Sequence, residues 1–293
     1  MHIEDWRLER QRTGGSPKNT RRAFEKLRQA LDQAVNWQLI ALNPARRVTV
    51  RVPEPTEVNV WTPDEVVTFL EHPTVRNHRM YAYFHLAIGT GMRPSELLGL
   101  RVDSVNLETR ELLIEQGSVT VRGHMVQNAP KTEHSRRWLE LSEEDCEVVK
   151  AHLERRERER RKGRRWQESG LLFVTTNGTP ILTRNMLYDL KGLVNRINGV
   201  SKTRKGYPKK VKGYQPPPPE KRILSEMTLY GLRHTYGSIS NAANMDVKIF
   251  GARMGHKHSS FTLDRYVKVY KEHRRAAAIS PKELAQRAKR SAE

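Results

Sequence analysis

The sequence predicts a mainly helical α+β protein with a small antiparallel sheet. Apolar residues recur at helical spacing through several long segments, and many of these segments begin at Ser, Thr or Pro and end at Gly. Residues 111–141 differ, because short apolar runs there are separated by turn residues, which is typical of antiparallel strands. Helices are therefore expected to dominate, with the main sheet confined to that stretch.

Residues 1–52 predict part of a helical bundle. The clearer helix covers residues 19–40, and Asn43–Pro44 is expected to stop it. Two helices bury little apolar surface, so this segment is not expected to be a complete domain. A Pro-containing linker over residues 53–60 precedes a larger domain over residues 61–293. The apolar positions of the helix are Phe24, Leu27, Leu31, Val35 and Leu39.

The larger domain begins with well-marked helix ends. Thr62 is a candidate N-cap, with Pro63 at the first helical position and Glu65 completing a capping box. The apolar segment 80–91 predicts a buried helix that ends at Gly89 and Gly91. A further helix is expected to start at Pro94.

The strand region contains a candidate turn at Arg122–Gly123, and Lys131 is expected at a strand end or hairpin tip. Ser142 predicts the start of a long helix over residues 143–162, whose charge run we interpret as a solvated face. Asn177–Gly178 indicates a hairpin. Thr183 is a candidate cap of a further helix, and Ser280–Pro281 is expected to start one last helix. Residues 200–222, which contain four consecutive prolines, predict a basic, extended surface insertion.

The charge balance indicates a polyanionic partner. The 53 Lys and Arg residues exceed the 33 Asp and Glu residues by 20. Nucleic acid is the favoured partner, with ribosome association or simple solubility as the alternative. A membrane surface is disfavoured, because no long apolar run or amphipathic anchor is present. The single cysteine, Cys146, excludes an intramolecular disulfide and a Cys-rich zinc site, and the charged N-terminus favours an intracellular location.

Residues 227–270 concentrate side chains suited to anion chemistry. Tyr230, Arg233 and His234 lie within five residues of one another, His256 follows a glycine, and Tyr266 stands in a polar context. As a helix, this segment places Tyr230 and Arg233 on one face. An arginine, an imidazole and a phenol together suggest anion binding, proton transfer and a nucleophile.

Further motifs precede this segment in a definite order. TGMRPSE contains Arg93, PKTEHSRR contains Lys131, LRHT contains Arg233, and GH and TLDRY close the series. This ordered set resembles the tyrosine recombinase (phage integrase) family of DNA strand-exchange enzymes, over about residues 16–275. The resemblance implies a tyrosine-recombinase-like catalytic domain, preceded by part of a helical, SAM-like core-binding domain within residues 1–52.

The resemblance also implies roles for individual residues. Arg93 and Arg233 match the two catalytic arginines, and Glu96 matches the acid that supports the first. Lys131 matches the hairpin lysine that acts as general acid, His256 the residue that hydrogen-bonds the scissile phosphate, and Tyr266 the nucleophile. Tyr270 is a rival nucleophile.

One position departs from the family pattern. Tyr230 stands where the family usually has a histidine, three residues before the second arginine. A phenol donates a hydrogen bond to phosphate but is a poor general base near neutral pH. Phosphate binding is thus expected to survive while activation of the nucleophile weakens. His234 points in another direction and is expected to pack structurally.

The implied reaction is transesterification of double-stranded DNA through a 3′-phosphotyrosyl intermediate, without metal, ATP or another cofactor. The implied assembly is a homotetramer on DNA, in which residues 280–293 dock on the neighbouring protomer and DNA-bending or directionality factors assist. The implied location is the bacterial cytoplasm, in association with the nucleoid. The gene would belong to a bacterium, a phage or another mobile element.

Two other functions remain open at this stage. Tyr230 and the short N-terminal region are also compatible with a catalytically weak or inactive relative that binds DNA, and the chain would then be a fragment or remnant. A type IB-like topoisomerase uses similar chemistry, although the ending TLDRYVK followed by a terminal helix argues against it.

Overall fold

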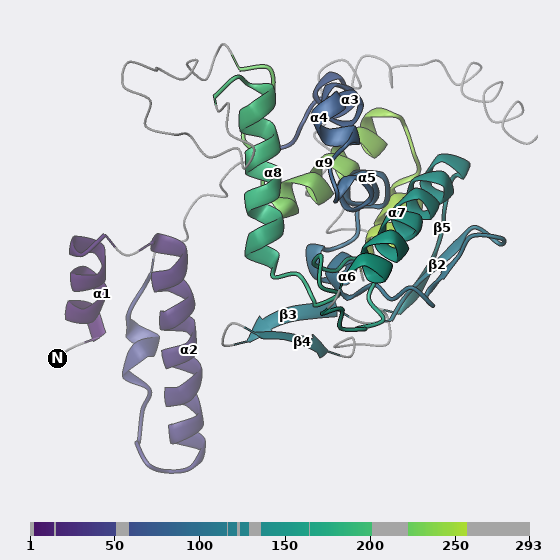
Figure 1. The fold of residues 1–293 in the computed structure, drawn as a ribbon. Coiled ribbons are helices and arrows are strands. Elements are labelled where there is room, and N and C mark those ends of the chain that lie inside the picture. The colour runs from purple at the N-terminus through teal and green to yellow at the C-terminus, as the bar shows by residue number, and fades with distance from the viewer. Residues whose placement is uncertain are drawn as a thin grey trace, which may run out of the picture. The chain divides into compact units, whose positions relative to one another are not determined.

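A computed structural model of the chain describes residues 3–14, 16–50, 59–115, 117–121, 124–128, 136–163, 165–200 and 222–256. The chain divides into two compact units, Met1–Glu57 and Val58–Glu293 (Figure 1). The boundary lies inside the linker predicted at residues 53–60. The predicted fold class is confirmed, since the described elements are mostly helices with small antiparallel sheets.

The smaller unit contains α1 (Ile3–Arg12), α2 (Pro17–Asn36) and the 3₁₀ helix η1 (Pro44–Arg47). The prediction that the long helix extends to residue 40, before a stop at Asn43–Pro44, was wrong, because α2 ends at Asn36 and Leu39 is 70% exposed. Asn43 caps η1 instead: its side chain accepts from the Ala45 amide at 2.8 Å and donates to Asp32 Oδ1 at 2.8 Å. These bonds fold the chain back along α2.

The larger unit contains the remaining elements. Its helices are α3 (Pro63–Glu71), α4 (Pro73–Arg76), α5 (Tyr81–Thr90), α6 (Pro94–Gly99), α7 (Glu143–Lys162), α8 (Thr183–Ile197), α9 (Leu229–Ala242) and α10 (Val247–Met254). Its strands are β1 (Val105–Asn106), β2 (Glu111–Ile114), β3 (Gly117–Val121), β4 (His124–Asn128) and β5 (Arg137–Glu140).

Local sequence accounts for most of the predicted helix starts that the structure describes. The expected capping box is present at α3, where Thr62 Oγ1 accepts from the Glu65 amide at 3.2 Å and the Glu65 carboxylate accepts from the Thr62 amide at 2.9 Å. Ser142 caps α7 in the same way. Thr183 is not a cap, since it is the first residue of α8 and the N-cap is Leu182, which makes no side-chain bond.

The strand region forms two sheets. β1, β2 and β5 pair antiparallel in the order β1-β2-β5, with Leu112 opposite Leu139. β3 and β4 form a separate antiparallel pair with Val121 opposite His124, as a turn at Arg122–Gly123 requires. The segment 111–121, which precedes the predicted turn, is thus divided between the two sheets. The turn residues and Lys131 lie outside the described part of the chain.

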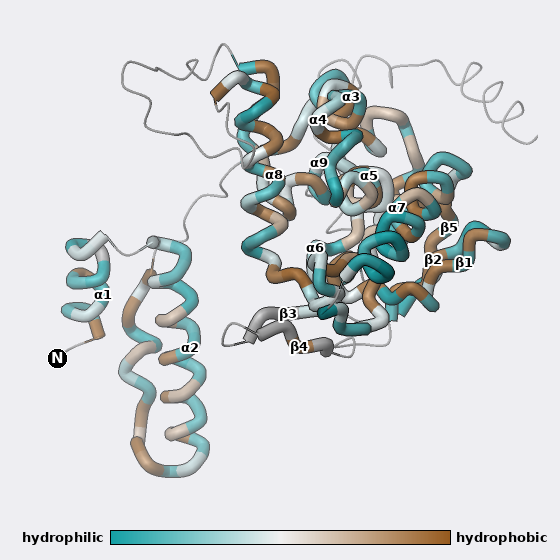
Figure 2. Tube along the Cα trace, in the orientation of Figure 1, coloured by the Kyte–Doolittle hydropathy of each residue, from teal (hydrophilic) through white to brown (hydrophobic). Residues whose placement is uncertain are grey.

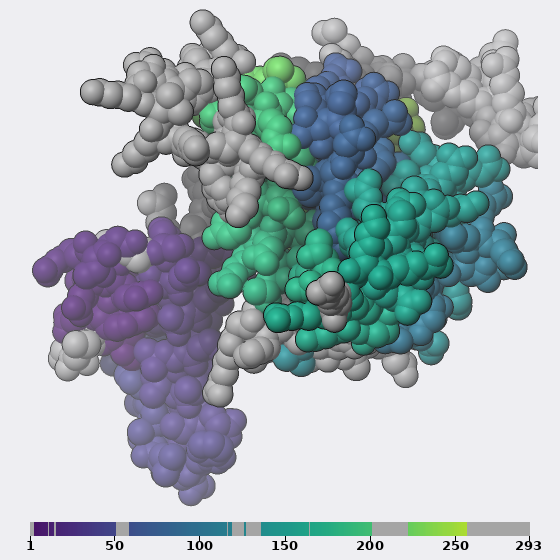
Figure 3. Space-filling model, in the orientation of Figure 1, coloured from purple at the N-terminus to yellow at the C-terminus, as the bar shows by residue number. Residues whose placement is uncertain are grey.

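The core of the larger unit surrounds α5. Most α5 side chains are buried, and aromatic rings pack edge to face around the helix, as for Phe69 and Phe84 with centroids 5.8 Å apart. Helix α7 lies at the surface and is mostly hydrophilic (Figures 2 and 3). Glu157 binds Arg161 at 2.9 Å one helical turn away, which supports the interpretation of the charge run as a solvated face. Among the helices described, none has the length and apolarity of a membrane span.

The inner side of α7 contains a buried histidine that makes stability depend on pH. His152 Nε2 donates to the Leu172 carbonyl at 3.1 Å. Burial lowers the pKa of His152 to about 4, with nearby arginines contributing, although the bond to Leu172 acts in the opposite direction. An unfolded histidine has a pKa near 6.5, so the unfolded chain binds more protons between these values. The stabilisation is therefore complete above about pH 6.5 and is lost as the pH falls towards 4.

We expect the free energy of unfolding to fall by about 2 kcal/mol through His152 between about pH 7.5 and pH 5. Urea unfolding at several pH values measures this change. His152→Gln retains an N–H donor for Leu172 but does not titrate, so its loss of stability over this range should be smaller by the same amount. An equal loss in both proteins would contradict the assignment.

Candidate active site

Segments distant in sequence meet near the turn between α5 and α6. This turn presents Arg93, α9 presents Arg233, and the end of α10 presents His256. Hydrogen bonds and electrostatic interactions connect all three. The structure therefore brings together three of the six site residues that the sequence predicts.

The turn before Arg93 requires a glycine. Gly91 ends α5 with φ of +63°, and a Cβ at this position would collide with the ring of Tyr236 on α9. Arg233, only 4% exposed, donates from Nη1 to the Gly91 carbonyl at 2.7 Å. Helix α9 thus holds the turn that presents Arg93 and places both guanidinium groups in one region.

Glu96 fixes the orientation of Arg93. Arg93 Nη1 donates to Glu96 Oε1 at 2.6 Å, and the Arg93 amide donates to Oε2 at 2.9 Å. Burial raises the pKa of Glu96, but hydrogen bonding and charge from Arg137, together with the charge of Arg93, outweigh burial and hold the pKa below its usual value. Glu96 is therefore an ionised, buried anchor, as expected of an acid that supports this arginine.

Arg137 on β5 is a site residue that the sequence reasoning missed. It donates to Glu96 Oε2 at 2.9 Å from Nη2 and to Oε1 at 3.2 Å from Nη1. Its Nε also donates to the Arg253 carbonyl at 2.9 Å. The only available signal was its place in the motif PKTEHSRR, which contains two adjacent arginines and does not show which of them points inward.

His256 follows the end of α10. Gly255 caps this helix with φ of +71°, and Arg93 Nη2 donates to the Gly255 carbonyl at 3.0 Å. The pKa of His256 is lowered to about 4. Burial is the largest cause, and smaller contributions come from the charges of Arg233, Arg93, His234 and Arg137. The imidazole is therefore neutral near pH 7, where one ring nitrogen can donate a hydrogen bond to an anion.

Tyr230 has a different environment from Arg233. It lies in the first turn of α9 and is 55% exposed, whereas Arg233 is buried. Tyr230 and Arg233 both lie on α9, three residues apart, but the Tyr230 side chain is exposed to solvent and the Arg233 side chain is buried. The interaction described for Tyr230 is with the buried Tyr83, whose pKa is raised by burial and secondarily by Tyr230.

His234 is closer to the chemistry than we expected. It is half-buried on α9, and its charge contributes to the lowered pKa of His256. Its influence on His256 adds an electrostatic role to the expected packing role. Lys131, Tyr266 and Tyr270 lie outside the described residues, so their positions stay predictions.

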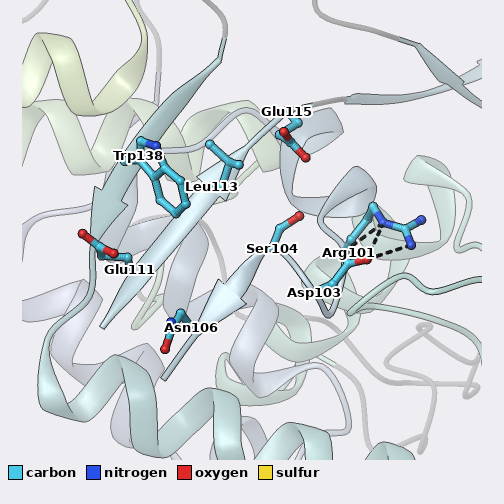
Figure 4. A pocket seen from close by; sticks show the side chains of 8 residues that line it. All are labelled: Arg101, Asp103, Ser104, Asn106, Glu111, Leu113, Glu115 and Trp138. Atoms are coloured by element: carbon cyan, nitrogen blue, oxygen red, sulfur yellow. Dashed lines mark hydrogen bonds and ion pairs between the residues drawn. The ribbon is translucent and has the colours of Figure 1, made fainter. Parts of the chain in front are cut away.

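The assembled groups are suited to a phosphodiester. Two arginines supply charge and planar donors, and a neutral imidazole supplies a further donor. A separate pocket on the outer face of the β1-β2-β5 sheet contains none of these residues (Figure 4). Its three carboxylates disfavour a polyanion, although Arg101 pairs with Asp103 at 3.0 Å. The pocket is lined by Arg101, Asp103, Ser104, Asn106, Glu111, Leu113, Glu115 and Trp138.

Comparison with known sequences identifies related proteins over most of the chain. The model of the phage integrase family matches residues 59–273. The tyrosine recombinase XerC-like protein of Caldanaerobacter subterraneus subsp. tengcongensis is 25% identical over 275 residues, covering 87% of this chain and 63% of that protein. An integrase of Streptomyces ambofaciens is 24% identical over 255 residues, covering 84% of this chain and 60% of that protein. The chain thus spans about three-fifths of the length of these relatives.

Comparison with solved structures confirms the fold. A structure of the Tn1549 transposon integrase in complex with a circular intermediate DNA aligns with a TM-score of 0.71 at 22% identity. The alignment covers 93% of this chain and 82% of that chain. At this identity the likeness shows a shared architecture.

Proposed function

The chain belongs to the phage integrase family, and from that premise we propose that it is a site-specific recombinase that cuts and rejoins duplex DNA. The convergence of Arg93, Arg233 and His256 from three distant segments carries the proposal. The formal charge of +20 supports DNA as the substrate, because phosphate contacts dominate the affinity of proteins for DNA. The complex of the Tn1549 integrase with DNA supports the same substrate class.

The proposed reaction exchanges one phosphodiester for another. The Tyr266 hydroxyl releases its proton to solvent water and attacks the scissile phosphorus, a 3′-phosphotyrosyl bond forms, and the bond to the 5′ oxygen breaks. Lys131 donates a proton to the leaving 5′ oxygen. The bond broken and the bond formed have similar energies, so the exchange requires no nucleotide hydrolysis. The reverse attack by a 5′-hydroxyl from a partner strand rejoins the DNA.

The arginines stabilise the charge that develops during this exchange. Arg93 and Arg233 face the non-bridging oxygens of the phosphate in the proposed complex, and His256 donates a hydrogen bond to one of them. Because Glu96 and the Gly91 carbonyl already hold the guanidinium groups, little reorganisation is needed when the negative charge develops. The lowered pKa of His256 in the free protein favours a neutral imidazole when DNA first binds.

Tyr230 favours a second candidate function, a DNA-binding relative with weak catalysis. The Tyr230 side chain is exposed, and a phenol can donate a hydrogen bond to a phosphate but is a poor general base. Strand cleavage would then be slow although the site still binds DNA.

In either case we propose that four protomers assemble on two duplexes, with residues 280–293 docking on a neighbour.

A covalent trapping experiment tests the proposal and separates the two candidates. The protein is incubated with a nicked duplex that carries a core site taken from the DNA flanking its gene. We expect an SDS-resistant adduct, and peptide mapping should locate the DNA on Tyr266. An adduct on Tyr270 would reassign the nucleophile. Absence of any adduct on a duplex that the protein demonstrably binds would leave the DNA-binding function.

A further inference from the structure

We propose that Arg137 is a positioning residue of this active site, which sets Arg93 and His256 relative to each other by holding Glu96 and the end of α10. The inference rests on the proposed function and assigns Arg137 no contact with the substrate. It identifies β5, a strand without any predicted catalytic residue, as part of the site.

The contacts of Arg137 require a guanidinium group. Three nitrogen atoms of one side chain bind two separate elements: Nη1 and Nη2 donate to the Glu96 carboxylate on α6, and Nε donates to the Arg253 carbonyl on α10. The side chain is only 10% exposed, so water competes little for these donors. A lysine has one compact ammonium group and cannot make this planar set of contacts.

The two elements that Arg137 holds are the two that Arg93 also contacts. Arg93 shares the Glu96 carboxylate with Arg137 and donates to the Gly255 carbonyl at 3.0 Å. Both arginines therefore satisfy carbonyl groups at the end of α10, where a helix leaves such groups without intrahelical partners. Glu96 connects the two arginines, so a displacement of Arg137 is transmitted to Arg93 through the shared carboxylate.

Arg137 also lies close to Gly255, the residue that precedes His256. A Cβ atom on Gly255 would lie 2.7 Å from Arg137 Nη1, so the glycine allows the chain to pass close to the guanidinium before it reaches His256. The charge of Arg137 is one of those that lower the pKa of His256. Arg137 thus affects the position and the protonation of a group that is proposed to bind the scissile phosphate.

Arg253 provides a matched control. Its side chain also connects α10 with β5, because Nη1 donates to Glu140 Oε2 at 3.1 Å and Nη2 donates to the Glu140 carbonyl at 3.0 Å. It makes no described contact with Glu96. If Arg137 only holds the strand against the helix, losing either arginine should have the same consequence.

The test compares Arg137→Lys, Arg137→Gln and Arg253→Gln in the full chain. Single-turnover formation of the covalent adduct should slow by about 10–100-fold in both Arg137 variants, because small displacements of catalytic groups cost about this much. Affinity for the uncleaved duplex should change little. Arg253→Gln should cleave at a rate close to that of the wild type, even if its thermal unfolding midpoint falls as far as those of the Arg137 variants.

The pKa of His256, followed by NMR in the free protein, supplies a readout independent of cleavage. It should rise towards the ordinary value in Arg137→Gln and stay unchanged in Arg253→Gln. An unchanged pKa, or cleavage by the Arg137 variants at the rate of Arg253→Gln, overturns the inference. A wild-type protein that binds the duplex without forming an adduct refutes the proposed function instead, and the titration of His256 then still decides whether Arg137 positions this end of α10.

Discussion

Tyr266→Phe is expected to abolish the covalent protein–DNA adduct and strand exchange while leaving DNA binding intact. The substitution removes one oxygen atom, the proposed nucleophile, and retains the aromatic ring. No attack on phosphorus can then form a phosphotyrosyl bond. Denaturing gel electrophoresis of the protein with a labelled nicked duplex measures the adduct, and a mobility shift of the same duplex measures binding.

Tyr270→Phe is the matched control, because it removes the same atom from the rival tyrosine four residues later. We expect this variant to form the adduct at the wild-type level. If Tyr270→Phe loses the adduct and Tyr266→Phe retains it, the nucleophile has been assigned to the wrong tyrosine.

Arg233→Ala is expected to slow cleavage by about 10²–10³-fold, the usual cost of removing one preorganised donor from a site of developing charge. The effect on stability should be smaller. Arg233 Nη1 binds the Gly91 carbonyl at 2.7 Å, and leaving a buried carbonyl without its partner costs about 1–3 kcal/mol. Single-turnover cleavage and urea unfolding measure the two effects separately.

Arg158→Ala is the control for net charge. Arg158 lies on the exposed face of α7, with Glu154 at 4.0 Å, and its removal changes the formal charge by the same amount. We expect near wild-type cleavage and stability from this variant, because an exposed ion pair contributes little. Equal loss of cleavage in both variants would show that overall charge, and not the site, determines the rate. Arg233→Lys then tests geometry, because it keeps the charge but loses the planar fork.

Local patterns in the sequence were sufficient to predict the ends of helices where a few neighbouring residues decide the structure. The caps at Thr62 and Ser142 were predicted correctly, because each depends on a hydrogen bond to an amide three residues away. The end of α2 was not predicted correctly. The chain leaves the helix before Asn43, and the Asn43 side chain then bonds back to residues of α2. Thr183 failed as a cap because the same side chain can equally occupy the first helical position.

The sequence by itself determined the family, because the order of several short motifs can be recognised without knowing how the chain folds, and it predicted the types of side chain in the candidate site. Only the tertiary structure decided how those residues are held. It joined Arg137 to Glu96 across 41 positions, buried Arg233 against Gly91 and lowered the pKa of His256. The physical reason is that hydrogen-bond partners and desolvation depend on which segments meet in space, and no pattern within a short segment specifies that.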